Sequence, residues 1–90
     1  MKNEYTITDE SDLIRAAIAG DSGAVEAALG REDVNLSDSD GWTALHIAAR
    51  NGNNDICRLL LSRPTIDVNV KNKWKSTPLM IAAGSGNLDV

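Results

Sequence analysis

Short apolar runs alternate with polar, glycine-containing stretches along the chain. In the central run, Leu45, Ala48 and Ala49 recur at the spacing of one helix face. Thr43 can accept hydrogen bonds from the first free N–H groups of this helix, and Gly52 can end it in the left-handed region. A helix this short is marginally stable alone, because its nucleation is costly. We therefore expect it to pack against neighbouring helices of the same kind.

Apolar residues at the same spacing predict four further helices. Three of them are marked by Leu13, Ala16 and Ala17 before Gly20, by Val25, Ala28 and Leu29 before Gly30, and by Ile56, Leu59 and Leu60 before Pro64. Pro78 suits the first position of the last helix, because its missing N–H would lack a helical partner there in any case. Together these segments predict an all-α fold.

Three blocks of sequence recur further along the chain, all displaced by the same number of positions. Residues 33–35, 43–49 and 51–53 return as residues 67–69, 77–83 and 85–87. A weaker copy of the helix start lies upstream at residues 11–17, with a slightly shorter displacement. Self-similarity at such a period indicates stacked units, because one such unit cannot bury its apolar face alone.

With these motifs the chain resembles an ankyrin repeat protein. The family's repeat has about 33 residues, with a β-turn, two helices and a TPLH-type signature. Residues 43–49 match this signature with Ala44 in the place of Pro, and residues 77–83 match it with Met80 in the place of His. The resemblance covers nearly the whole chain from about Asp9. It implies an ankyrin-type solenoid of helix–turn–helix units whose short β-hairpin loops project and bind other proteins.

The repeats divide residues 1–90, which we expect to form a single domain, into three units. These are an N-terminal end repeat at residues 9–35, a full repeat at residues 36–69 and a truncated repeat at residues 70–90. A stable array usually needs about three complete repeats, and the helix that should pair with residues 79–83 is almost entirely missing. We expect the N-terminal part of a longer array; the alternative is a complete chain whose uncapped C-terminal end pairs with a second copy.

Composition narrows the class of protein. Apolar residues make up 42% of the 90 residues while Phe is absent, so the core must be aliphatic and rich in alanine. The single Cys excludes an internal disulfide, and one Cys with one His argues against a zinc site. No apolar run approaches the roughly 20 residues of a membrane span, and residues 1–5 lack the apolar core of a signal peptide. We expect a cytoplasmic or nuclear protein.

Charge is distributed unevenly between the two halves of the chain. Residues 1–45 carry three Lys or Arg against ten Asp or Glu, whereas residues 46–90 carry six against three. This gradient can steer a partner with the opposite layout. The alternative is that the charges only keep the surface solvated, as they do in any soluble protein.

The residues able to do chemistry form no catalytic set in the sequence. His46 stands alone in the repeat signature, where we expect it to hydrogen-bond the backbone of the neighbouring turn. Cys57 is expected to be a small buried apolar residue. Residues 84–86 lack the trailing Lys and Ser or Thr of a P-loop. We expect a protein that is not an enzyme and uses no cofactor; the alternative is a recruiting segment of a larger enzyme whose catalytic domain lies outside this chain.

The resemblance implies protein contacts at the loop tips and on the inner helices. The residues at these positions are Ser39, Asp40, Trp42, Arg50, Asn51, Lys73, Trp74, Lys75, Ser76 and Ser85. For Trp42, the sequence supports packing and binding equally. Trp74 lies nearer a tip, which favours binding, because exposed aromatic residues on a rigid scaffold suggest recognition. The lysines around Trp74 make nucleic acid an alternative ligand, which the acidic net charge of the chain disfavours.

One position departs from the repeat pattern at a turn. Gly41 can take a positive φ at no steric cost, but its equivalent in the next unit is Lys75. A residue with a side chain costs roughly 1–2 kcal/mol in the left-handed region. The tip of the third unit is therefore either strained or folded into another kind of turn.

Overall fold

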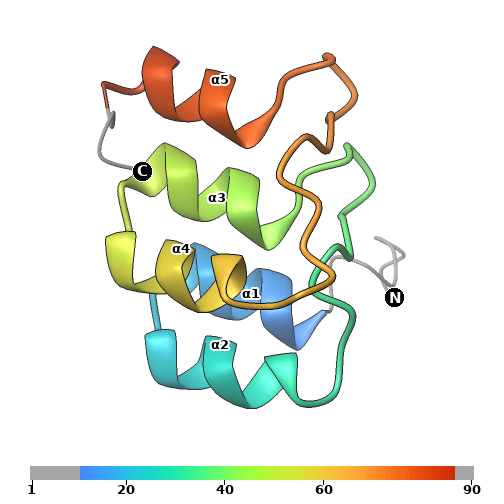
Figure 1. Cartoon of the computed structure of the whole chain (residues 1–90), viewed down its shortest axis with the longest axis vertical. Coiled ribbons are helices and arrows are strands. Elements are labelled where there is room, and N and C mark those ends of the chain that lie inside the picture. The colour runs from blue at the N-terminus through green and yellow to red at the C-terminus, as the bar shows by residue number, and fades with distance from the viewer. Residues whose placement is uncertain (1–10, 87–90) are drawn as a thin grey trace, which may run out of the picture.

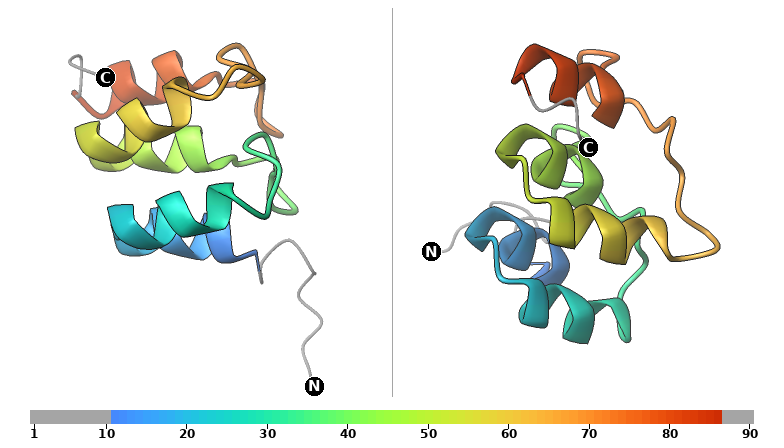
Figure 2. Two further views of the ribbon diagram at one scale, coloured as in Figure 1. Left: turned by 60° about the horizontal axis from the view of Figure 1, so that its bottom comes forward. Right: turned by 60° about the vertical axis from the view of Figure 1, so that its left-hand side comes forward.

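Short helices in two layers make up the computed structural model, which describes residues 11–86 (Figure 1). They are α1 (Asp12–Ala19), α2 (Ser22–Leu29), α3 (Ala44–Asn51), α4 (Asn54–Leu61) and α5 (Pro78–Gly84). Helices α1, α3 and α5 form one layer, in which α3 contacts both of the others, and α2 and α4 form the second layer (Figure 2). The predicted all-α stack is confirmed.

Side-chain caps determine where most of these helices begin. In four of them the capping side chain accepts a hydrogen bond from the backbone N–H three residues later; the caps are Ser11, Asp21, Thr43 and Thr77. Gly20 and Gly52 end α1 and α3 with φ of 71° and 70°, in the left-handed region. The helix starts and stops predicted for α1 and α3 are therefore confirmed.

The core is aliphatic, as the composition predicts. Its largest fully buried apolar side chains come from α1, α2 and α4, and are Leu13, Ile14, Val25, Ile56 and Leu60. In α3 every residue from Ala44 to Ala49 is buried, whereas the sequence pattern predicted one apolar face. The reason is that α1, α4 and α5 all pack against α3. This central helix therefore fixes the positions of its neighbours.

Two long loops project from the same edge of the stack (Figure 1). Within residues 11–86, β-structure is limited to an antiparallel bridge between Ser37 and Thr43. The first loop also closes with a backbone hydrogen bond from Asp38 N–H to Trp42 O at 2.9 Å, and Asn72 N–H makes the equivalent bond to Ser76 O at 3.0 Å in the second. The expected β-hairpins are therefore tight hairpin-shaped loops without extended strands.

One face of α5 is left exposed by the residues that the structure places. Leu79 is 70% exposed, whereas its equivalent in α3, Leu45, is 3% exposed. Met80 is exposed as well. Residues 87–90, where the sequence predicted the next helix to begin, lie outside the described part of the chain, as do residues 1–10.

Candidate functional site

The two projecting loops have the same internal frame, built by one side chain at the base of each. In the first loop, Asp38 Oδ1 accepts hydrogen bonds from the N–H groups of Asp40 and Trp42, both at 2.9 Å. In the second loop, Asn72 Oδ1 accepts two equivalent bonds, at 2.9 and 3.0 Å. Sequence reasoning missed both residues. Their equivalent positions in successive repeats were the signal that could have identified them.

The turn at each tip is also the same. Gly41 has φ of 82°, and Lys75 has φ of 64°, so both occupy the left-handed region. Of the two alternatives for the third-unit tip, the strained one is therefore correct. Lys75 bears a conformational cost of roughly 1–2 kcal/mol that glycine would avoid.

The two loops are in contact with each other, in addition to the hydrogen bonds within each loop. Lys73 N–H donates to Asp40 O at 2.8 Å, and Lys73 Nζ lies 3.5 Å from Asp40 Oδ1. A Cβ atom added to Gly41 would lie 2.9 Å from Asn72 Cα, so the two backbones are in direct contact. The two tips consequently form one rigid edge.

His46 ties the start of α3 to the second loop. Its Nδ1 atom accepts the Thr43 N–H at 3.2 Å, which places the ring proton on Nε2. Nε2 then donates to Ser76 O at 2.8 Å. The prediction that His46 holds the backbone of the neighbouring turn is confirmed.

Trp42 both packs on the scaffold and borders a hollow. The side chain is half-buried against the core, and its ring lies 5.6 Å from the His46 ring in an edge-on arrangement. Arg50 Cζ sits 5.1 Å from the centroid of the Trp42 ring. We call the adjoining hollow of about 160 Å³ the inner groove; it is lined by Ile18, Asp38, Asp40, Trp42, Ile47 and Arg50.

Trp74 stands in a different environment, on the tip of the second loop. It is 59% exposed, and Lys73 Nζ lies 5.5 Å from its ring centroid. Lys71 and Lys75 are exposed on the same loop. The structure thus joins the inner groove to the Trp74 tip through the Asp40–Lys73 contact.

The remaining predicted residues are distributed around this surface. Ser39 is exposed on the first tip, and Ser76 is half-buried below the second, where its carbonyl oxygen accepts from His46. Asn51 and Ser85 are exposed at the last turn of α3 and the C-cap of α5. Ile18, which is 59% exposed beside the inner groove, was not among the predicted residues.

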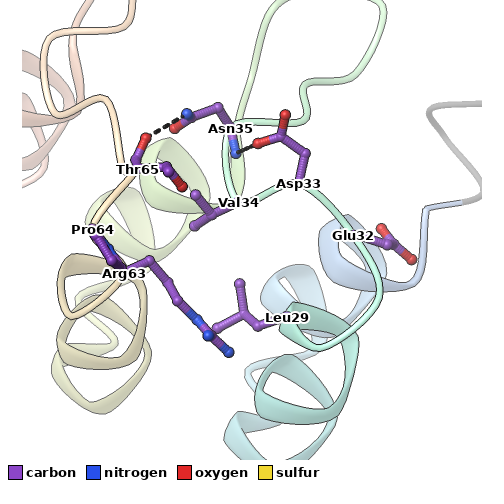
Figure 3. A pocket seen from close by; sticks show the side chains of 8 residues that line it. All are labelled: Leu29, Glu32, Asp33, Val34, Asn35, Arg63, Pro64 and Thr65. Carbon is purple, nitrogen blue, oxygen red and sulfur yellow. Dashed lines mark hydrogen bonds between the residues drawn. The ribbon is translucent and has the colours of Figure 1, made fainter.

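A second hollow of about 370 Å³ lies between the ends of α2 and α4 and the loops that follow them (Figure 3). Its lining residues are Leu29, Glu32, Asp33, Val34, Asn35, Arg63, Pro64 and Thr65. Asn35 bridges its two walls: the amide donates to Thr65 O at 2.8 Å, and Oδ1 accepts the Asp67 N–H at 2.8 Å. This hollow contains none of the predicted binding residues.

The one cysteine among residues 11–86, Cys57, lies on α4 and carries a free thiol. Cys57 is 3% exposed, so the prediction of a small buried apolar residue is confirmed, and burial raises the pKa of its thiol. This part of the chain contains no group of three His, Cys, Asp or Glu that could hold a metal ion. It also contains no helix long and apolar enough to cross a membrane.

Comparison with known proteins identifies the repeat. Residues 13–90 match the family model for ankyrin repeats in three copies. The chain is 45% identical over 85 residues to a probable E3 ubiquitin-protein ligase of Oryza sativa subsp. japonica, an alignment that covers 91% of this chain and 19% of the ligase.

Other relatives belong to different functional classes. The chain is 40% identical over 84 residues to a homologue of transient receptor potential cation channel subfamily A member 1 from Caenorhabditis elegans, with 90% of this chain and 7% of the channel covered. It is 35% identical over 80 residues to the liver isoform of mitochondrial glutaminase from Rattus norvegicus, with 88% and 13% covered. The chain therefore spans a fifth or less of the length of these three curated relatives.

Proposed function

Because the chain belongs to the ankyrin repeat family, we propose that it binds another protein through one continuous surface formed by the inner groove and the Trp74 tip. Ankyrin repeats generally serve as protein-interaction modules, and the family match occupies residues 13–90 with no catalytic domain in the same stretch. The finer assignment to these residues rests on the geometry of the two loops.

The observation that carries the proposal is the fastening of the two tips. The contacts between Asp40 and Lys73, and between Gly41 and the Asn72 backbone, hold both loops in one arrangement before any partner arrives. A preformed surface loses little conformational freedom on binding, which lowers the ordering cost of the complex. Trp74, exposed on this rigid edge, is the kind of residue that dominates interface energetics.

The inner groove supplies the second part of the surface. Ile18 and Ile47 contribute apolar side chains to its lining, while Asp40 and Arg50 contribute opposite charges. Trp and Arg are enriched among interface residues whose truncation weakens binding most. The groove is therefore suited to one apolar side chain of a partner whose neighbouring groups are polar.

The experiment compares which proteins are retained by immobilised chain and by single variants. Ile18→Asp should lose groove ligands and Trp74→Ala should lose tip ligands. Both side chains are exposed, so we expect both variants to fold. Glu26→Ala, exposed on α2 in the other layer, is the matched control. Circular dichroism verifies that each variant is folded. If a specific partner is retained equally by all four proteins, the proposed surface is wrong.

A second candidate function is the recruitment of substrates to a larger enzyme. It is favoured by the relatives named as a ubiquitin ligase and a glutaminase, of which this chain covers 19% and 13%. In that case the same surface binds a substrate or a regulator. The full reading frame of the gene distinguishes the two functions, since the second requires an enzymatic domain in the same polypeptide.

A further inference from the structure

The two loop tips share one backbone conformation but carry opposite charges. At equivalent positions, residues 37–42 read Ser-Asp-Ser-Asp-Gly-Trp and residues 71–76 read Lys-Asn-Lys-Trp-Lys-Ser. Asp38 and Asn72 make the same two hydrogen bonds, so the frame of each loop is independent of the side chains at its tip. The lysines and the tryptophan of the second tip therefore need an explanation other than loop structure.

The backbone conformation of Lys75 is the clearest feature of this tip that loop structure does not explain. Glycine occupies this position in the first loop at φ of 82°, and Lys75 adopts φ of 64° in spite of its side chain. Residues held in sparsely populated backbone conformations concentrate at functional sites, where surrounding structure maintains them. Lys75 is also exposed, and the residue that precedes it, Trp74, has an exposed aromatic side chain.

The charges of this tip are largely available to a partner. Within the described residues, Lys71 and Lys75 have no ion pair, and Lys73 lies 3.5 Å from Asp40 while remaining 62% exposed. Trp74 lies between Lys73 and Lys75 in the sequence, and its side chain is largely exposed. One exposed ring on a loop that carries three lysines, with Lys73 Nζ 5.5 Å from the ring centroid, is complementary to an apolar side chain flanked by carboxylates.

We propose that Lys71, Lys73, Trp74 and Lys75 bind a short acidic segment of a partner protein, with its carboxylates facing the lysines and an apolar side chain packed on the Trp74 ring. The proposal rests on the proposed function and specifies the partner for the tip end of that surface. The segment is short, because the basic patch ends where Lys73 meets Asp40.

Because the basic patch ends at Asp40, a long polyanion is disfavoured as the ligand. Beyond Lys73 the edge continues into Asp38 and Asp40, so a nucleic acid strand that followed the loops would meet carboxylates instead of cations. Nucleic acid binding depends on neutralising many phosphates along a basic track, and one loop does not supply it.

The test uses the intact chain with Trp42→Phe, which leaves Trp74 as the only tryptophan and as a fluorescent reporter. The probe is a synthetic peptide with a leucine flanked on each side by two glutamates, and the control peptide has glutamines in their place. We expect the acidic peptide to shift Trp74 emission and to bind more weakly as salt is added. Equal binding of the two peptides, or no binding of either, overturns the proposal.

Lys75→Gly separates the binding role from the structural one. It should weaken the acidic peptide about two- to fivefold, the effect of losing one exposed charge pair, while it raises the melting temperature by relieving the left-handed strain. Arg58→Ala, which removes a cation from α4, should leave peptide affinity unchanged. If Lys75→Gly raises the melting temperature and leaves peptide affinity intact, the strain has no role in binding and Lys75 is wrongly assigned to the site.

Two other classes of anion, a nucleic acid and a lipid surface, are tested as alternative ligands. A single-stranded oligonucleotide and phosphatidylserine vesicles are titrated under the same conditions, and tighter binding of either than of the acidic peptide overturns the proposal. Ile18→Asp distinguishes this failure from failure of the proposed function. If the partner captured by the chain depends on Ile18 but the acidic peptide does not bind, the inner groove stands as a site and the tip assignment fails.

Discussion

At the residue scale, the contact between the two loops depends on Gly41, where a side-chain carbon would not fit. Gly41 has φ of 82°, and an added Cβ would lie 2.9 Å from Asn72 Cα and 3.0 Å from Lys73 N. Both neighbours are backbone atoms, which cannot rotate away as a flexible side chain could. The glycine therefore satisfies a conformational and a steric requirement together, whereas Lys75 at the equivalent place satisfies only the conformational one, at a cost.

Gly41→Ala should consequently destabilise the chain by about 2 kcal/mol or more, since left-handed strain and backbone crowding add. The measurement is the urea midpoint of unfolding. Gly84→Ala is the matched control, because it lies within α5 with no atom in the way and should be neutral or slightly stabilising. Equal effects of the two substitutions would contradict the close contact between the loops.

Cys57 gives a prediction for alkaline pH. Burial raises the pKa of its thiol in the folded chain above the value of the unfolded chain, about 8.5. Folding therefore favours the protonated thiol, and the folded chain loses stability as the pH rises above about 8.5 and the unfolded thiol ionises. Unfolding free energies at pH 7 and pH 10 should differ more in the native chain than in Cys57→Ala. An identical pH dependence in both would show that the thiol is accessible to water.

At the element scale, each loop is a hydrogen-bonded turn supported by a neighbouring repeat. Asn72 is 7% exposed and accepts two backbone N–H groups, so its side chain substitutes for the strand pairing that the loop lacks. Helix α1 is supported in a similar way by Glu32, whose carboxylate accepts the N–H groups of Asp12 and Leu13 at 3.1 and 3.3 Å. Such carboxylates are favourable at helix N-termini.

Asn72→Ala should destabilise the chain by about 1–3 kcal/mol, because it leaves the partly buried N–H groups of Trp74 and Ser76 without this acceptor. Asn72→Asp should be tolerated, since Asp38 performs the same task in the first loop. Thermal unfolding of both variants tests this, and Trp74 emission reports whether the loop keeps its shape. Equal loss of stability in the two variants would show that the side-chain oxygen is unimportant.

How far the sequence predicts this structure depends on the range of each interaction. The ends of α1 and α3 followed from capping residues a few positions away, such as Thr43 and Gly52. The role of Glu32 did not, because the N-terminus that it caps is distant in the sequence and depends on how the helices pack. Asp38 and Asn72 resemble ordinary solvated loop residues, and the exposure of Ile18 follows from stacking alone.

At the scale of the whole molecule, the stack is close to one-dimensional, since each unit contacts mainly its neighbours. Helix α3 lies in the middle and is covered on several sides, while α5 leaves Leu79 and Met80 70% and 57% exposed. A hollow of about 100 Å³ lined by Leu45, Leu61, Val68, Pro78 and Leu79 adds to this apolar face. Exposed apolar surface of this kind favours association.

We therefore predict that the 90-residue chain self-associates weakly through α5. Sedimentation velocity should show a concentration-dependent increase in mean mass, which Leu79→Lys suppresses without lowering stability, because this side chain is largely exposed. Ile18→Lys, exposed on α1 at the other end of the inner layer, is the control and should associate as the native chain does. A monomer at all concentrations would rule out pairing through this face.

The hydrogen bonds that shape each loop do not involve the side chains at its tip, and this affects how the sequence of such a chain can evolve. Asp38 and Asn72 hold two loops in one shape although one tip is acidic and the other basic. Mutations at the tips are thereby uncoupled from the scaffold, so new ligand preferences can arise without a compensating change in the helices. The same property makes the first loop a place to graft foreign recognition residues, provided that Asp38 and Gly41 are retained.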